Sequence, residues 1–155
     1  MQKPTDPDAL LSPFSFRWRI QMRWSDMDEI RHINNAVYLT YFEEGRLRYL
    51  HETLQIPYRD VDTRMIVARN TVDYIQPLFF LDEPYLYIRC SHVGNKSFEL
   101  EQMIVNEKGG GKSLVARGST VLVAFNYKLN QSVRVPDEWR SEFSGYEKEL
   151  KADRE

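Results

Sequence analysis

Carboxylate, amide and imidazole side chains are concentrated in residues 23–35, with the sequence RWSDMDEIRHINN. A carboxylate in this run could act as a general base or as a nucleophile. An apolar pattern with helical spacing begins directly afterwards, so the unpaired first N–H groups of a helix are expected beside the run. Such amides can stabilise an oxyanion or a polarised carbonyl. The alternative interpretation is an ordinary polar turn with an Asx cap.

The helix that would supply these amides is expected to be capped by Asn34 or Asn35. Its apolar stripe recurs at spacings of four, three and four residues, typical of a helix face, at Tyr38, Phe42, Gly45 and Tyr49. A glycine inside a helix costs about 1 kcal/mol relative to alanine. We therefore expect the helix to approach a sheet closely at its glycine, and to end before Pro57.

The other apolar patterns have a period of two and predict strands, the first of them in residues 14–24. Four further strands are expected in residues 65–76, 85–93, 97–106 and 113–125. Glycine-containing turns at 94–95 and 109–111 would join the last three strands as hairpins. One long helix against a five-stranded antiparallel sheet is an α+β fold.

The predicted domain covers residues 14–140 and shows no internal repeat. Three prolines argue against a stable helix in residues 1–13, which we expect to form a flexible N-terminal segment. The sequence after Pro136 is strongly charged, and we expect a short, fraying helix followed by a charged tail in residues 141–155.

The composition excludes several classes of protein. With 42% hydrophobic and 28% charged residues, the 155-residue chain is neither disordered nor fibrous. A net charge of -2 argues against nucleic-acid binding, and a single cysteine excludes an intrachain disulfide or a cysteine-rich zinc site. No apolar run is long enough to cross a membrane or to form a signal peptide, so we expect a cytoplasmic protein with no membrane partner.

The polar run and the sequence after it resemble hotdog-fold thioesterases, and most closely the 4-hydroxybenzoyl-CoA thioesterase-like family. The resemblance covers about residues 14–140, and parts of it are also similar to plant-type acyl-ACP thioesterases. It is carried by Asp26-x-Asp28, His32-Ile33-Asn34-Asn35, Tyr38-Leu39, Tyr41-Phe42-Glu43, Arg46, Tyr74, Pro77, Gly94-x-Lys96-Ser97 and Val135-Pro136. It implies a hotdog fold, in which a five-stranded antiparallel sheet wraps around one long central helix.

The resemblance also implies roles for individual residues. Asp28 matches the catalytic carboxylate, His32 matches a histidine that assists at the thioester, and the backbone N–H of Asn35 would hold the thioester carbonyl. Asp26 would support the turn through hydrogen bonds. The residues expected to contact the substrate are Asn34, Tyr38, Glu43, Tyr74, Lys96 and Ser97. For Glu43, an exposed helix charge paired with Arg46 is the alternative, and for Lys96 and Ser97 it is a solvated hairpin.

Two positions depart from the family pattern. The acyl-ACP enzymes carry asparagine where this chain has Ile30, so their full triad is absent. Many relatives carry glycine where this chain has Arg31, so the resemblance does not fix the path of the backbone at this turn.

The implied activity is hydrolysis of an acyl-CoA or acyl-ACP thioester without a metal or cofactor. Asp28 would either activate water or attack the carbonyl through a mixed anhydride. The chain is expected to form a homodimer or homotetramer, in which residues of a second subunit complete the site. A non-catalytic acyl-CoA-binding hotdog protein is the main alternative. A hotdog dehydratase is a weaker one, because the chain lacks the His/Asp or Glu pattern of those enzymes.

Overall fold

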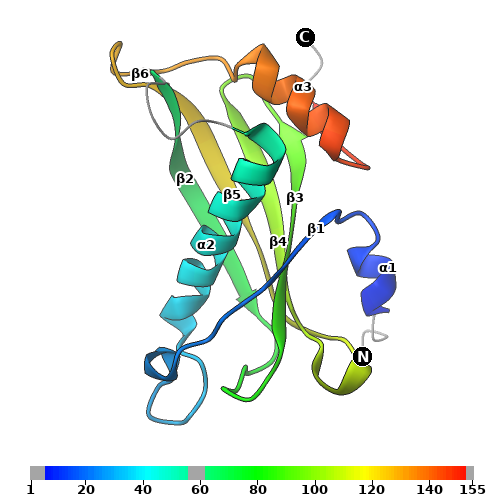
Figure 1. The fold of residues 1–155 in the computed structure, drawn as a ribbon. Helices are drawn as coiled ribbons and strands as arrows, with labels where there is room; N and C mark the ends of the chain where they lie inside the picture. The colour runs from blue at the N-terminus through cyan, green and yellow to red at the C-terminus, as the bar shows by residue number, and fades with distance from the viewer. Residues whose placement is uncertain (1–5, 56–61, 153–155) are drawn as a thin grey trace.

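The computed structural model describes residues 6–55 and 62–152 (Figure 1). The elements, in chain order, are α1 (Pro7–Leu11), β1 (Phe16–Arg19), the 3₁₀ turn η1 (Trp24–Asp26), α2 (Asn35–Leu54), β2 (Thr63–Tyr74), β3 (Pro84–Val93), β4 (Ser97–Asn106), the 3₁₀ turn η2 (Lys108–Gly110), β5 (Ser113–Asn126), β6 (Gln131–Ser132), α3 (Asp137–Tyr146) and β7 (Lys151–Ala152). The helix and strands predicted from the sequence are all present, and the last four strands differ from the predicted bounds by at most two residues. The first strand is shorter than the predicted 14–24, because pairing with β3 ends at Arg19 and η1 begins at Trp24.

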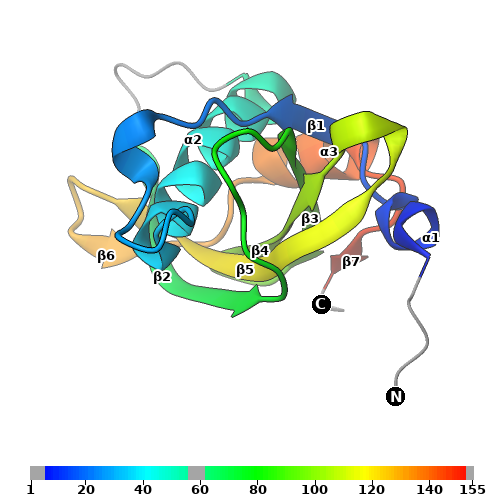
Figure 2. The same cartoon turned by 90° about the horizontal axis from the view of Figure 1, so that it is seen from below.

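The main strands form a sheet with the order β1-β3-β4-β5-β2, in which all neighbours are antiparallel. Two short strands add to it, with β6 paired to β5 and β7 paired in parallel to β3. The sheet curls around α2, as the view from the end where that helix begins shows (Figure 2). The predicted α+β hotdog architecture is therefore confirmed.

Helix α2 begins and ends where local chemistry favours it. The side chain of Asn34, the N-cap, accepts a hydrogen bond from the backbone N–H of Ala36. Gln55 caps the C-terminus in the left-handed conformation, with φ 48°, and its N–H bonds the carbonyl of His51. The whole predicted stripe is buried, and it packs on the concave face of the sheet.

Gly45 lies where α2 crosses β3, as predicted. A Cβ atom on this residue would overlap Leu86 Cδ2 and come within 3.2 Å of Ile88 Cδ1. Both of these side chains are fully buried, so neither can move away freely. The close approach of helix and sheet thus requires glycine.

We expect Gly45→Ala to lower the free energy of unfolding by about 1–2 kcal/mol, because overpacking a core outweighs the gain in helix propensity. Gly145→Ala in α3 is the matched control, since a Cβ there meets nothing within 4 Å. That variant should keep or slightly raise the stability. Denaturant titrations of both variants measure the difference, and equal stabilities would contradict a tight helix–sheet contact.

The N-terminal segment differs from the prediction, because residues 7–11 form the short helix α1. The prediction that prolines exclude a helix here was wrong: Pro7 occupies the first helical position, where a missing N–H costs nothing. Leu11 and the neighbouring Phe14 cover the outer face of the sheet in a second apolar cluster with Tyr87, Met103 and Val105.

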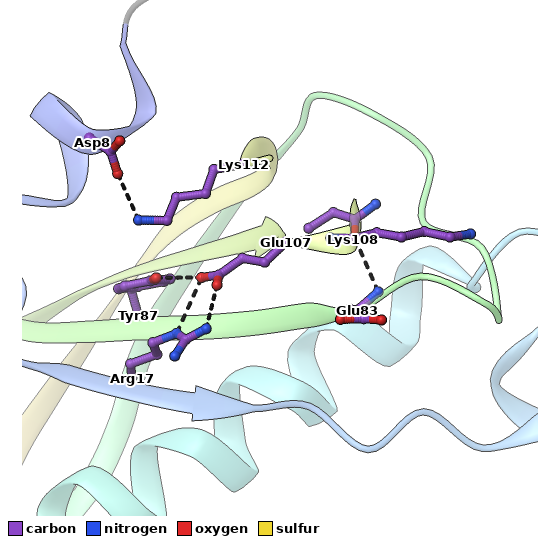
Figure 3. Close-up of polar contacts among 8 residues, drawn as sticks. Asp8, Arg17, Glu83, Tyr87, Glu107, Lys108 and Lys112 are labelled. Atoms are coloured by element: carbon purple, nitrogen blue, oxygen red, sulfur yellow. Dashed lines mark hydrogen bonds and ion pairs between the residues drawn. The ribbon is translucent and has the colours of Figure 1, made fainter. Parts of the chain in front are cut away.

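Ion pairs hold this segment and β1 in place (Figure 3). Lys112, in the turn between β4 and β5, donates to Asp8 over 2.6 Å. The carboxylate of Glu107, in the same turn, forms an ion pair with the Arg17 guanidinium and accepts a hydrogen bond from the Tyr87 hydroxyl. The turn between β4 and β5 therefore fastens both α1 and the edge strand β1.

The C-terminal helix also differs from the prediction, because the core extends beyond residue 140. Phe143 of α3 is fully buried, stacked on Tyr49 at 6.4 Å and tilted against Phe98 at 5.0 Å. The buried carboxyl of Glu147 accepts hydrogen bonds from the Tyr49 hydroxyl and the Cys90 amide, and burial raises its pKa. Because the composition of this segment is dominated by charged residues, its sequence does not indicate that Phe143 and Glu147 are buried.

Candidate functional site

The residues between η1 and α2 fold into a closed hairpin-like loop. The Asp28 N–H donates to the carbonyl of His32 over 2.8 Å, and Met27 and Ile33 form an isolated antiparallel bridge. The Asn34 N–H donates to the carbonyl of Asp26 over 2.9 Å. These bonds bring Asp28 and His32 beside the first turn of α2.

Asp26 anchors this loop to the helix. Its carboxylate is 2% exposed and accepts the backbone N–H of Arg23 at 2.8 Å, the Arg23 guanidinium and the Tyr41 hydroxyl at 2.7 Å. Burial alone would raise the pKa of Asp26, but these donors outweigh it and hold the pKa below its usual value. The expected supporting role of Asp26 therefore has a geometric basis, and Tyr41 is a partner that the sequence did not reveal.

Arg31 adopts the left-handed conformation, with φ 64°. A side chain in this conformation costs about 1–2 kcal/mol relative to the right-handed one, a cost that the glycine of the resembling family pattern would avoid. The strain is local, and the loop still closes through the bond from the Arg31 N–H to the Asp28 carbonyl, at 3.1 Å.

The carboxylate of Asp28 is held on one side only. Its Oδ1 accepts the backbone N–H of Ile30 at 3.0 Å and that of His32 at 3.2 Å. Within the described residues, Oδ2 has no hydrogen-bond partner or ion pair. The side chain is half-buried, so one carboxylate oxygen is fixed and the other is open to a bound molecule or to water.

Among the described residues, the backbone N–H groups at the start of α2 also divide into those with a hydrogen-bond partner and one without. The N–H of Ala36 is bound by the Asn34 side chain, and that of Val37 by the Asn34 carbonyl, both at 2.9 Å. The N–H of Asn34 itself bonds Asp26. In the part of the chain that the structure describes, the Asn35 N–H alone among these four amides lacks a partner. This donor has the positive end of a 20-residue helix behind it.

A pocket of about 550 Å³ joins these groups. It brings together most of the residues singled out from the sequence, namely Asp28, His32, Asn34, Asn35, Tyr38 and Tyr74. Apolar side chains complete the wall, among them Ile33 and Pro77. The pocket therefore combines a carboxylate, an imidazole and an unpaired amide on a partly apolar surface.

Aromatic rings fix the shape of this pocket. The imidazole of His32 stands edge-on to Phe79, with ring centres 4.9 Å apart. Tyr38 packs edge-on against Tyr74 at 5.1 Å, and burial raises the pKa of Tyr38 to about 12, so its hydroxyl stays protonated. Phe79 was missed from the sequence because it lies in the loop after β2, far along the chain from His32.

Three expected substrate contacts lie elsewhere in the single chain. Glu43 is exposed on α2 outside the pocket wall, and its charge acts on the buried Arg46, whose pKa is lowered by burial. Lys96 and Ser97 lie in and after the β3–β4 turn, where Lys96 Nζ is 3.4 Å from the carbonyl of Ser132. That turn lies beside α3 at the far end of α2 (Figure 1).

A larger, open hollow of about 740 Å³ lies between the end of β1 and the outer side of α2. Its wall includes Trp18, Glu44 and Arg48, with the Arg48 guanidinium 4.8 Å from the Trp18 ring centre. It contains neither Asp28 nor the start of α2. Size alone therefore does not identify the site, and of the two it is the smaller pocket that combines Asp28 with the start of α2.

Two features are absent from the described part of the chain. Residues 6–55 and 62–152 contain no group of three or more His, Cys, Asp or Glu side chains arranged to hold a metal ion. In the same residues, no helix has both the length and the apolar character needed to span a membrane.

Comparison with known proteins agrees with the geometry. A thioesterase from Thermus thermophilus, whose crystal structure contains coenzyme A and Zn, is 29% identical and superimposes with a TM-score of 0.75 over 86% of this chain and 95% of that one. A predicted thioesterase from Bacillus stearothermophilus is 26% identical, with a TM-score of 0.74 over 84% and 95% of the two chains. The Bacillus subtilis protein YsmA is 29% identical over 125 residues, 81% of this chain and 82% of its own.

The family comparison covers the pocket and all strands of the sheet except β1 and β7. The model of the thioesterase-like superfamily matches residues 22–143, which include the Asp28 loop, α2 and most of α3. Such a match extends over far more than half of the chain and supports thioester hydrolysis as the general chemistry. The chain belongs to the thioesterase-like superfamily.

Proposed function

We propose that the protein hydrolyses acyl thioesters of coenzyme A or of acyl carrier protein at the pocket around Asp28. Asp28 either takes a proton from the attacking water or attacks the carbonyl carbon itself to form a mixed anhydride that water then cleaves. The N–H of Asn35 stabilises the negative charge that develops on the carbonyl oxygen. The C–S bond breaks, and the products are a free carboxylic acid and a thiol.

One observation carries this proposal: an open carboxylate oxygen and an unpaired helix-start amide line the same pocket. Hydrolysis needs both, since one group must supply or activate the nucleophile while the other polarises the carbonyl. In an ordinary polar turn both oxygens of the carboxylate would have donors within the loop, as those of Asp26 do, whereas the turn uses only Oδ1 of Asp28. His32 lines the same pocket, and its proposed role is to assist at the carbonyl.

A second copy of the chain would complete the site. Strand β2 is a 12-residue edge strand, with one side paired to β5 and the apolar residues Ile66 and Val67 exposed. Long, apolar edge strands favour pairing with another strand. Antiparallel pairing of two β2 strands in a two-fold dimer would place the Lys96 end of one chain beside the Asp28 end of its partner. Lys96 and Ser97 are then proposed to hold the coenzyme A or carrier portion of the substrate.

The test is release of free thiol from a panel of short-chain, long-chain and aromatic acyl-CoA thioesters, with an acyl carrier protein thioester in parallel. We expect at least one acyl class to be hydrolysed well above the rate without protein. The panel also defines the preferred acyl group. Binding of acyl-CoA without thiol release from any class would contradict hydrolysis and favour a non-catalytic binding protein.

A further inference from the structure

Asn35 takes part in two peptide groups, one on each side of its Cα atom, and these two groups have different hydrogen-bond partners. The peptide before it carries the unpaired N–H, and the carbonyl of that peptide, from Asn34, accepts the N–H of Val37. The peptide after it is held at its N–H end, where Ala36 donates to the Asn34 side chain over 2.9 Å. The direction of the free N–H depends on how firmly both peptides are fixed.

The second peptide is also held at its carbonyl end, by a group from a different element. The hydroxyl of Tyr74, the last residue of β2, donates to the carbonyl oxygen of Asn35 over 2.9 Å. The Tyr74 ring stands edge-on to Tyr38, with an angle of 85° between the rings. Tyr38 is 2% exposed and lies on α2, the helix that begins with Asn35. Its contact with the Tyr74 ring therefore limits movement of the Tyr74 hydroxyl.

The backbone that carries Tyr74 is fixed by the sheet. The next two amides, of Ile75 and Gln76, both donate to the carbonyl of Val115 in β5, at 2.9 and 3.1 Å. Tyr74 itself pairs with Ala116 in the β2–β5 register. The hydroxyl therefore connects a sheet-bound backbone to the first residue of α2.

We infer that Tyr74 is a positioning residue, whose hydroxyl orients Asn35 so that its N–H points at the reacting carbonyl. The inference rests on the proposed function. An oxyanion donor is effective when it is directed in advance at the place where charge develops, and a small misplacement weakens it. The neighbouring peptide is clamped by Asn34 and Tyr74 together, which is more than helix capping alone requires.

Replacing Tyr74 with phenylalanine removes the hydroxyl and keeps the ring against Tyr38. We expect kcat for thioester hydrolysis to fall about tenfold, less than the 10²–10³-fold effect of deleting an oxyanion donor, because the amide is displaced rather than lost. KM should change less than about twofold, since the donor acts mainly on the transition state. Tyr127→Phe is the matched control, because Tyr127 is 56% exposed, lies outside the pocket wall and should leave both constants unchanged.

Amide NMR spectra of the substrate-free protein supply a readout independent of activity. The Asn35 and Ala36 resonances should shift in Tyr74→Phe and remain in place in Tyr127→Phe. A rise in KM with kcat unchanged would make Tyr74 a substrate contact instead, and unchanged kinetics would remove any role for its hydroxyl; either result overturns the inference. Both results presuppose a wild-type protein that hydrolyses a thioester, so failure of the proposed function is recognised separately by the absence of wild-type turnover.

Discussion

Replacing Asp28 with asparagine is expected to lower kcat for thioester hydrolysis by about 10³-fold, within the range measured for the loss of a general base. The amide of asparagine keeps an oxygen that can accept the N–H groups of Ile30 and His32, so the loop can retain its shape. The same amide cannot take a proton from water, and it is a poor nucleophile. The chemistry should therefore be lost while the fold remains.

The measurement is steady-state thiol release by Asp28→Asn, together with its thermal unfolding midpoint. Asp137→Asn serves as the control, because Asp137 is an exposed carboxylate of α3 that pairs with Arg134 and lies outside both the pocket and the edge strand β2. An exposed ion pair of this kind contributes little to stability, and the control should hydrolyse like the wild type. Turnover by Asp28→Asn within a few-fold of the wild type would exclude Asp28 from the reaction.

Local chemistry explains why the helix and the loop before it could be predicted from the sequence. An asparagine followed by apolar residues at helical spacing defines both the start of α2 and its buried face, and the structure confirms Asn34 as the cap. The glycine in that face, Gly45, was attributed to a close helix–sheet contact, and Leu86 and Ile88 provide it. Each of these features depends on residues within a few positions of one another or on a steric requirement visible in one residue.

Features that depend on distant partners could not be predicted in this way. Tyr74 was recognised as a residue of the pocket, but its hydroxyl bond to Asn35 joins residues 39 positions apart. Tyr41 carries a general signal, since a tyrosine on a buried helix face needs a hydroxyl partner. The identity of that partner, Asp26, emerges only when the loop is folded against the helix.

The termini show a different limit, because composition is an average. The prolines and charges of the end segments indicated mobile chain, yet single well-placed residues decide the structure there. Leu11 closes an apolar cluster on the outer face of the sheet, and Phe143 enters the main core beneath α3. The structured unit therefore extends beyond the 14–140 expected from the sequence.

The separation of Lys96 from Asp28 within one chain leads to the second prediction. The two residues lie near opposite ends of α2, whose 20 residues span about 30 Å. If both act on one substrate, they must come from different chains of a two-fold dimer. Asp28→Asn should then disable the site that contains the replaced carboxylate, and Lys96→Ala should lower kcat/KM about tenfold or more by removing a charged contact to the substrate.

Mixing Asp28→Asn and Lys96→Ala chains during refolding should therefore restore activity. Random pairing makes about half of the dimers mixed, and each mixed dimer has one site with both residues intact, so about a quarter of wild-type sites return. The assay is kcat/KM for thiol release, with the dimer fraction measured by light scattering. Mixing Asp28→Asn with the double variant Asp28→Asn/Lys96→Ala is the control and should restore nothing, because no chain then supplies the carboxylate. Mixed dimers that form without any gain in activity would show that Lys96 does not act across the interface, and the composite site would have to be abandoned while the role of Asp28 stands on its own test.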